Sequence, residues 1–131
     1  MRPAIRRKKV KVFIADDSLK VVERLTDLLE QIGWLKLIGR ATYGPEAVES
    51  IQELNPDVVI LDVRMPYGNG IDVLKAIKIT RPGTKVIIFT NFPYAQYRKK
   101  CLDAGADFFL DKSSEFNQIP GIILNLFQTR S

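Results

Sequence analysis

The segment KVKVFIADDS, residues 9–18, is an apolar run that ends abruptly on two adjacent carboxylates, Asp16 and Asp17. Its β-rich composition predicts a buried strand over Val10–Ala15. Neighbouring carboxylates repel each other, so they must face a group that makes their proximity tolerable. Other parts of the chain have to supply that group or the site that holds it.

The rest of the sequence repeats the same pattern of a short β-rich run followed by an amphipathic helix. Glycines mark expected helix ends at Gly33 and Gly105, and prolines mark expected helix starts at Pro45 and Pro93. The last helix should begin near Ile119, because Pro120 cannot lie inside a helix. Several strands are almost continuously apolar, as expected for parallel strands covered on both faces. The predicted fold class is α/β, a doubly wound five-stranded parallel sheet with strands at 10–15, 35–39, 58–61, 86–89 and 107–110.

Length and charge indicate one domain, expected over residues 10–131, preceded by a basic tail at 1–9. The chain has 131 residues, 46% of them hydrophobic, and a net charge of +5. A nucleic-acid-binding protein would spread such an excess over its folded surface, so we expect no direct nucleic-acid binding. We assign the tail no function. Five basic residues of the tail account for the whole net charge of the chain, namely Arg2, Arg6, Arg7, Lys8 and Lys9.

Several residue types are missing, and their absence limits the chemistry of the chain. There is no histidine and only one cysteine, Cys101. This excludes an internal disulfide, the usual zinc ligands and histidine-based catalysis. No apolar stretch approaches the ~18 residues of a membrane span, and the first nine residues lack a signal-peptide segment. We therefore expect a cytoplasmic protein without a membrane partner.

Polar residues follow the predicted strands, and parallel strands bring their carboxyl ends to one edge of the sheet. Crowded carboxylates need a cation, and an all-oxygen site suits Mg2+, which one or two carboxylates typically hold together with water and phosphate oxygens. Each residue also has a purely structural interpretation: a helix cap for Asp17 or Ser18, a loop acid, a strand end or a surface charge. Coincidence would have to place five of them on one edge, namely Asp16, Asp17, Asp62, Thr90 and Lys112.

The ordered set of motifs at these strand ends resembles the receiver domain of bacterial response regulators, best known from the stand-alone chemotaxis regulator. The motifs are IADDS at 14–18, LDVRMPYGNG at 61–70, FT at 89–90 and AGADFFLDK at 104–112. The resemblance covers residues 10 to about 128. It implies the flavodoxin-like receiver fold and a role in two-component signalling.

The resemblance also implies a role for each matching residue. Asp62 is the implied phosphoacceptor, a nucleophile that receives a phosphoryl group from a sensor histidine kinase, a phosphotransfer protein or a small phosphodonor. Asp16, Asp17, Asp62 and the backbone carbonyl of Arg64 are the implied Mg2+ ligands. Lys112 would pair with phosphate oxygens and Thr90 would bond the phosphoryl group through its hydroxyl. Phosphoryl transfer asks mainly for in-line positioning and charge neutralisation, which these groups supply.

Further expectations from the resemblance concern the switch and the lifetime of the phosphoryl group. Phe109 occupies the aromatic switch position and is expected to turn into space that Thr90 vacates. In receivers, the residues two beyond the acceptor and two beyond the threonine flank the path of the hydrolytic water. Here these residues are Arg64 and Phe92, and their bulk predicts slow autodephosphorylation.

Three departures from the family pattern have physical consequences. The lysine is usually followed by proline with a cis bond, but Ser113 follows here. A cis bond before a non-proline residue costs ~3 kcal/mol, so the sequence leaves the geometry at 112–113 open. Asn91 stands where the family prefers a small residue and would narrow access for the phosphodonor. Phe109 replaces the common tyrosine, which removes any partner hydrogen bond through a hydroxyl.

Two other classes of protein compete with an active receiver. A haloacid dehalogenase-like phosphatase also uses a nucleophilic aspartate with Mg2+, but it needs an acid two residues later, where this chain has Arg64. A pseudo-receiver would keep the fold as a binding module without phosphorylation. The intact chemical positions favour the active receiver, which is not an enzyme with substrate turnover.

The chain stops about where the last helix should end, so we expect no output domain and output through protein contact. The expected contact face combines residues 93–104, the strand at 107–110 and the last helix. A downstream protein or a second copy of the chain would dock there. The residues that suggest this face are Tyr94, Tyr97, Arg98, Lys99 and Lys100. The helical spacing fits Tyr97 equally well as a core-facing position.

Overall fold

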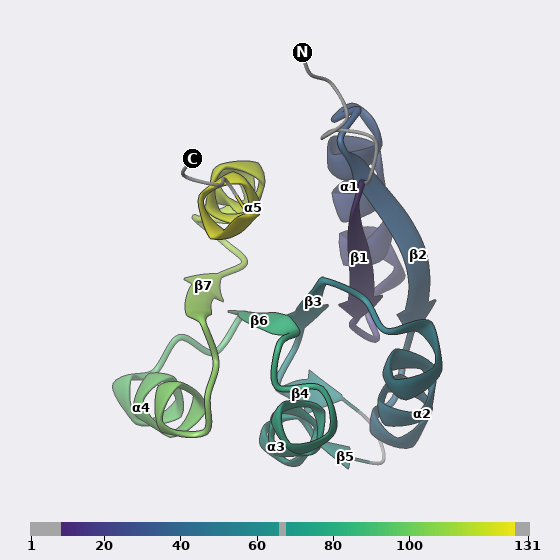
Figure 1. Ribbon diagram of the computed structural model, residues 1–131. Coiled ribbons are helices and arrows are strands. Elements are labelled where there is room, and N and C mark those ends of the chain that lie inside the picture. Colours follow the sequence, from purple (N-terminus) through teal and green to yellow (C-terminus); the bar gives the residue numbers. More distant parts are fainter. Residues whose placement is uncertain (1–8, 66–67, 128–131) are drawn as a thin grey trace.

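The structure, a computed structural model, describes residues 9–65 and 68–127. Residues 1–8 of the predicted tail therefore lie outside the described residues, as do Pro66 of the receiver motif and residues 128–131. Helices and strands alternate along the described chain, except that three successive strands stand between the second and third helices (Figure 1). In chain order they are β1 (Val10–Ala15), α1 (Leu19–Glu30), β2 (Leu35–Ala41), α2 (Gly44–Leu54), β3 (Val58–Leu61), β4 (Arg64–Met65), β5 (Gly68–Asn69), α3 (Gly70–Thr80), β6 (Lys85–Thr90), α4 (Ala95–Asp103), β7 (Phe108–Asp111) and α5 (Ile119–Phe127).

The main sheet has five parallel strands in the order β2-β1-β3-β6-β7. The chain moves outward from β1 in one direction to reach β2 and in the other to reach β3, β6 and β7. The strand order therefore reverses between β1 and β3, and this is the place where open α/β sheets bind ligands. The predicted fold class is confirmed.

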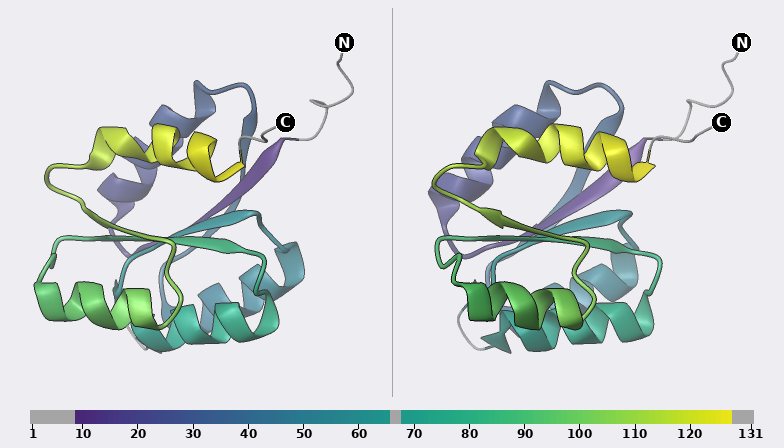
Figure 2. Two further views of the ribbon diagram at one scale, coloured as in Figure 1. Left: turned by 60° about the vertical axis from the view of Figure 1, so that its left-hand side comes forward. Right: turned by 90° about the vertical axis from the view of Figure 1, so that its left-hand side faces the viewer.

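Helices cover both faces of this sheet, with α1 and α5 on one side and α2, α3 and α4 on the other (Figure 2). Successive strand residues point to opposite faces. In β1, Val12 and Ile14 pack with residues of α1 and α5, whereas Phe13 and Ala15 pack with residues of the other three helices. All four side chains are fully buried, which explains why residues 12–15 are continuously apolar up to Asp16.

Most predicted boundaries lie within two residues of the observed ones, and the differences have local causes. The bounds predicted for β1 and β3 and the start of α5 at Ile119 agree with the structure; a short 3-10 helix, Phe116–Gln118, precedes α5. Strand β2 is two residues longer than predicted, β6 extends by one residue at each end, and β7 is shifted by one.

Two helix boundaries were predicted wrongly. Helix α4 begins at Ala95 rather than at Pro93, because Tyr94 is its N-cap and has an extended backbone with φ −74° and ψ 144°. Helix α1 ends at Glu30 and the chain turns through Gln31 and Ile32 before Gly33. Gly105, by contrast, ends its helical segment as expected, with a φ of +106° that favours glycine.

The short antiparallel pair β4–β5 was not predicted, and it shapes the loop after Asp62. Arg64 pairs with Asn69 in this ladder, and the backbone N–H of Gly70 donates to the carbonyl of Val63. A Cβ atom at position 70 would overlap the backbone of Val63. Gly70 is therefore required for the loop to fold back tightly beside Asp62.

Candidate functional site

Three strand ends bring Asp16, Asp62 and Lys112 together at the carboxyl edge of the sheet. They directly follow β1, β3 and β7, and the backbone N–H of each one continues the hydrogen bonding of the neighbouring strand, at 2.9–3.0 Å. The backbone of all three residues is thus fixed by the sheet rather than by a free loop. Asp16 and Asp62 flank the point where the strand order reverses.

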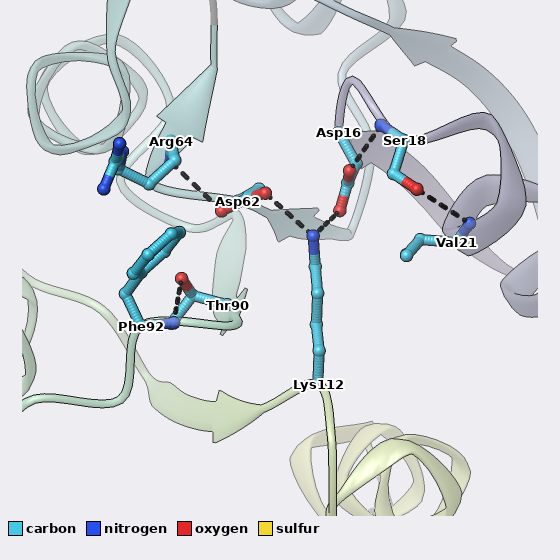
Figure 3. Close-up of polar contacts among 8 residues, drawn as sticks. All are labelled: Asp16, Ser18, Val21, Asp62, Arg64, Thr90, Phe92 and Lys112. Atoms are coloured by element: carbon cyan, nitrogen blue, oxygen red, sulfur yellow. Dashed lines mark hydrogen bonds and ion pairs between the residues drawn. The ribbon is translucent and has the colours of Figure 1, made fainter.

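The side chain of Lys112 extends from the end of β7 and places its ammonium group between the two carboxylates (Figure 3). Its Nζ lies 2.6 Å from Oδ2 of Asp16 and 2.8 Å from Oδ2 of Asp62. All three side chains are less than 10% exposed. Burial by itself would lower the pKa of Lys112, but the hydrogen bonds and charges of the two carboxylates outweigh it and raise the pKa. The ammonium group is therefore charged at neutral pH.

The acidic pair divides into a buried and an exposed member. Asp16 is 2% exposed, and its Oδ1 accepts a hydrogen bond from the backbone N–H of Ser18 at 2.8 Å. Burial raises the pKa of Asp16, against the opposing hydrogen bonds from Lys112 and Ser18. Asp17 is exposed and does not cap α1, since the N-cap is Ser18, whose hydroxyl accepts from the backbone N–H of Val21.

These carboxylates fit the predicted divalent cation. Asp16, Asp17 and Asp62 each offer one oxygen atom, and the three atoms lie within 4.8 Å of one another. Such a set of hard oxygen ligands suits Mg2+. Lys112 already engages one oxygen of Asp16, so a cation bound there would compete with the ammonium group for that carboxylate. A bound Mg2+ and the Lys112 ammonium group would therefore share the carboxylates of this site.

Thr90 and Arg64 lie beside this cluster, and both contact Phe92. The side chain of Thr90 is fully buried, and its hydroxyl oxygen accepts a hydrogen bond from the backbone N–H of Phe92 at 3.0 Å. The guanidinium carbon of Arg64 lies 4.3 Å from the centroid of the Phe92 ring, as Figure 3 shows. The two residues expected to flank the hydrolytic path are thus in cation–π contact. The backbone N–H of Arg64 donates to Oδ1 of Asp62 at 3.0 Å.

Phe109 lies in β7, three residues before Lys112, and packs into the core on the side of α4. It is 6% exposed and belongs to the same cluster as Cys101, whose pKa is raised by burial. Arg98 covers it from outside: the guanidinium lies 5.9 Å from the ring centroid and donates to the carbonyl oxygen of Phe109 at 3.4 Å. The ring is already buried in this structure, so a switch through Phe109 would start from an inward position.

The sequence analysis missed two groups of contacts, one on the side of the sheet covered by α1 and α5 and one in the turn after Lys112. The guanidinium of Arg24 on α1 lies 3.9 Å over the ring of Phe116, and Asp111 with Glu115 holds the turn that follows Lys112. The second group had a sequence signal, DKSSE at 111–115, because acids and serines spaced in this way are typical of side chain to backbone capping. No peptide bond within the described ranges is cis, which answers the open question about residues 112–113.

Removing the ammonium group should show how strongly the two buried acids depend on it. We expect Lys112→Ala to lower the free energy of unfolding by ~3 kcal/mol, because two buried carboxylates lose their cation. Mg2+ should restore more stability to this variant than to the wild type, since the acids then have no competing partner. Urea unfolding with and without Mg2+ measures both effects. Equal stabilisation of the two proteins by Mg2+ would contradict the competition at Asp16.

Comparison with known protein families matches residues 12–124 to the response regulator receiver domain. The chain belongs to this family, whose members are the phosphoacceptor domains of two-component signalling. It is 36% identical over 102 residues to the chemotaxis protein CheY of Thermotoga maritima, a match that covers 78% of this chain and 84% of CheY. The phosphatase and pseudo-receiver alternatives are not favoured.

Two further similarities extend this result to other family members. The chain is 41% identical over 108 residues to a protein-glutamate methylesterase/protein-glutamine glutaminase of Idiomarina loihiensis, covering 81% of this chain but 28% of that protein. The structure of the CheX-CheY-BeF3-Mg2+ complex from Borrelia burgdorferi aligns with a TM-score of 0.85 and 29% identity, over 93% of this chain and 92% of that one. The chain spans about half or less of the length of several curated relatives that it matches. Within the described residues, no helix is both long and apolar enough to cross a membrane.

Proposed function

We propose that this chain, as a receiver domain over residues 10–131, accepts a phosphoryl group on Asp62 in a Mg2+-dependent reaction. The observation that carries the proposal is the group formed by Asp62, Lys112 and the acidic pair. Asp62 is buried and offers one carboxylate to a site where an ammonium and a potential cation can neutralise the incoming phosphoryl oxygens. The relative from Borrelia burgdorferi, whose structure contains BeF3 and Mg2+, supports the same ligands here.

The roles proposed for the other residues follow from their positions. Asp16, Asp17, Asp62 and the carbonyl of Arg64 would hold Mg2+, which supplies positive charge to the transferring phosphoryl group. Lys112 would pair with its oxygens. Thr90 would donate a hydrogen bond from its hydroxyl to the phosphoryl group, because its oxygen already accepts one from the backbone N–H of Phe92 and its O–H can still donate. In this proposal the chain itself turns over no substrate other than its own phosphoryl group.

The proposed donors are a sensor histidine kinase, a phosphotransfer protein or a small phosphodonor, and the exchange takes place in the cytoplasm. Asn91 is exposed beside the site and would narrow the approach of the donor. Phosphotransfer profiling against the purified histidine kinases of the host identifies the donor. The test of the function itself is simpler: Mg2+ with beryllofluoride should shift amide resonances around Asp62, whereas a pseudo-receiver would show no Mg2+-dependent change.

We further propose that output occurs by protein contact through the face of α4, β7 and α5. Tyr94 is 56% exposed, and its ring centroid lies 5.9 Å from that of Tyr97, which is partly buried against the core. A chain of ring contacts leads from Phe92 beside the site to these tyrosines, since Phe92 lies 6.3 Å from Tyr94. Movement of Thr90 would therefore reach the face through residues 91–98 rather than through burial of an exposed Phe109. A downstream protein or a second copy of the chain would dock there.

Binding of beryllofluoride should therefore change the α4 region as well as the site. With Mg2+ present, we expect amide shift changes to extend from Asp62 and Lys112 to residues 93–110, because the Thr90 hydroxyl is hydrogen-bonded to Phe92, whose ring contacts Tyr94. Chemical-shift mapping by NMR measures the extent. Changes confined to the loops around Asp16, Asp62 and Lys112 would show that the proposed output route is wrong, while leaving phosphoacceptor function intact.

A further inference from the structure

The turn that follows Lys112 is closed by reciprocal hydrogen bonds between its two ends. Oδ1 of Asp111 accepts from the backbone N–H of Ser113 at 2.9 Å and from its hydroxyl at 2.8 Å, and Oδ2 accepts from the hydroxyl of Ser114 at 3.3 Å. In return, Oε1 of Glu115 accepts from the backbone N–H of Asp111 at 2.8 Å. The backbone N–H of Glu115 also donates to the carbonyl of Asp111 at 2.9 Å.

Lys112 is enclosed by this turn. On one side its backbone N–H donates to the carbonyl of Thr90 at 2.9 Å, which continues the ladder between β6 and β7. On the other side the chain leaves the sheet, and Ser113 stands where the family motif has proline. The hydrogen bonds of Asp111 and Glu115 fix the backbone on both sides of Lys112.

This fixed backbone matters because the functional atom of Lys112, its Nζ, lies at the far end of a flexible side chain. A lysine has four side-chain torsions, and holding it in one conformation costs up to about 2 kcal/mol of entropy. Its Nζ must nevertheless reach two carboxylates, at 2.6 and 2.8 Å. A small rotation of the backbone at residue 112 would be multiplied along the side chain and would move the ammonium group away from one of them.

We propose that Asp111 and Glu115 are positioning residues for Lys112, and that their turn replaces the proline of the family motif in aiming the ammonium group at the phosphoryl site. The inference rests on the proposed function, because it assigns Lys112 to the phosphoryl oxygens. Neither acid touches the reacting atoms: Asp111 contacts residues 113–115 and Glu115 contacts Asp111. The backbone and hydroxyl hydrogen bonds from Ser113 also lower the pKa of Asp111, so its carboxylate is ionised at neutral pH.

Mg2+ and the Lys112 ammonium group compete for the Asp16 carboxylate, and this competition distinguishes a loss of Lys112 positioning from a general destabilisation of the site. A loosened Lys112 binds phosphoryl oxygens less well, but it also releases Asp16 for Mg2+. Loss of positioning should therefore weaken binding of the phosphoryl mimic while Mg2+ binding remains equal or becomes tighter. A turn with a merely structural role would weaken both ligands together.

The test is isothermal titration calorimetry of Mg2+ alone and of beryllofluoride at saturating Mg2+. We expect Asp111→Ala to weaken beryllofluoride binding about tenfold, the usual size when groups that orient a functional side chain are removed. Its Mg2+ affinity should not fall. Asp111→Asn keeps an acceptor for the Ser113 N–H and should restore most of the loss, as Glu115→Gln should relative to Glu115→Ala. Asp103→Ala removes an equal charge from an exposed ion pair on α4 and should change neither affinity.

The Asp111→Ala substitution made in the Lys112→Ala variant shows whether Asp111 acts through the ammonium group. In Lys112→Ala there is nothing to position, so adding Asp111→Ala should leave Mg2+ affinity unchanged. Weakening of both ligands in Asp111→Ala, or a further loss of Mg2+ affinity in the double variant, overturns the inference. If the wild type binds no beryllofluoride, the proposed function fails instead. The positioning of Lys112 is then decided by the Mg2+ titrations alone: tighter Mg2+ binding in Asp111→Ala than in the wild type supports it, and equal or weaker binding refutes it.

Discussion

Incubation of the wild-type protein with acetyl phosphate and Mg2+ is expected to add a single phosphoryl group, and Asp62→Asn is expected to abolish the gain completely. Asp62 is the one acid of the cluster that has both Lys112 and the backbone N–H of Arg64 on its carboxylate. An asparagine at this position cannot attack phosphorus as a carboxylate does. Intact-mass measurement gives the result directly.

The chemistry of the product provides a second check on this prediction. A phosphoryl group on a carboxylate is an acyl phosphate, so it should be stable in acid and labile in base. Asp72→Asn, which changes an exposed acid at the start of α3, is the matched control and should be phosphorylated like the wild type. An equal mass gain in Asp62→Asn, or no gain in the wild type with any donor, would refute the assignment.

The second large effect concerns how long the phosphoryl group persists. The Arg64 guanidinium and the Phe92 ring lie 4.3 Å apart, at the positions that flank the water path in receivers. This contact narrows the path by which water would reach the phosphorus atom for in-line attack. We expect Arg64→Ala combined with Phe92→Ala to accelerate loss of the phosphoryl group roughly fivefold, the factor that corresponds to about 1 kcal/mol for opening one cation–π contact.

Single variants and a control make the cause of this acceleration visible. If the two side chains act as one barrier, either single substitution should give most of the double effect, because the energies of contacting residues are not additive. Lys99→Ala removes a cation from the exposed pair with Asp103 on α4 and should leave the rate unchanged. A decay rate of the phosphorylated mass that does not rise in the double variant would refute the barrier.

Much of the fold could be predicted from the chain because its local patterns agree with its global architecture. In β3 the apolar run and the strand have the same limits, and in β1 the buried residues 12–15 are apolar up to the end of the strand. Strand residues that are covered on both faces of the sheet are usually apolar. Gly105 and Pro120 mark boundaries through backbone restrictions that act within one or two residues. The antiparallel pair β4–β5 had no such signal, because two residues per strand are too few for a periodic pattern.

The members of the site could also be named in advance, because each one directly follows or ends a strand and the edge of a parallel sheet collects them. Asp16, Asp62, Thr90 and Lys112 were expected there, and the structure brings them to one edge. The order of motifs along the chain identified the family.

What only the tertiary structure decided is how these groups pair, since pairing depends on distances across strands that are remote in sequence. Lys112 and Asp16 are 96 positions apart in the chain, yet a 2.6 Å contact joins them. The same holds for Arg64 against Phe92 and for Arg98 over Phe109. Sequence determined which side chains reach the carboxyl edge, because strand ends are a local property. The packing of five strands and their helices determined which charges meet, because side-chain directions and burial are set by neighbours that no local pattern contains.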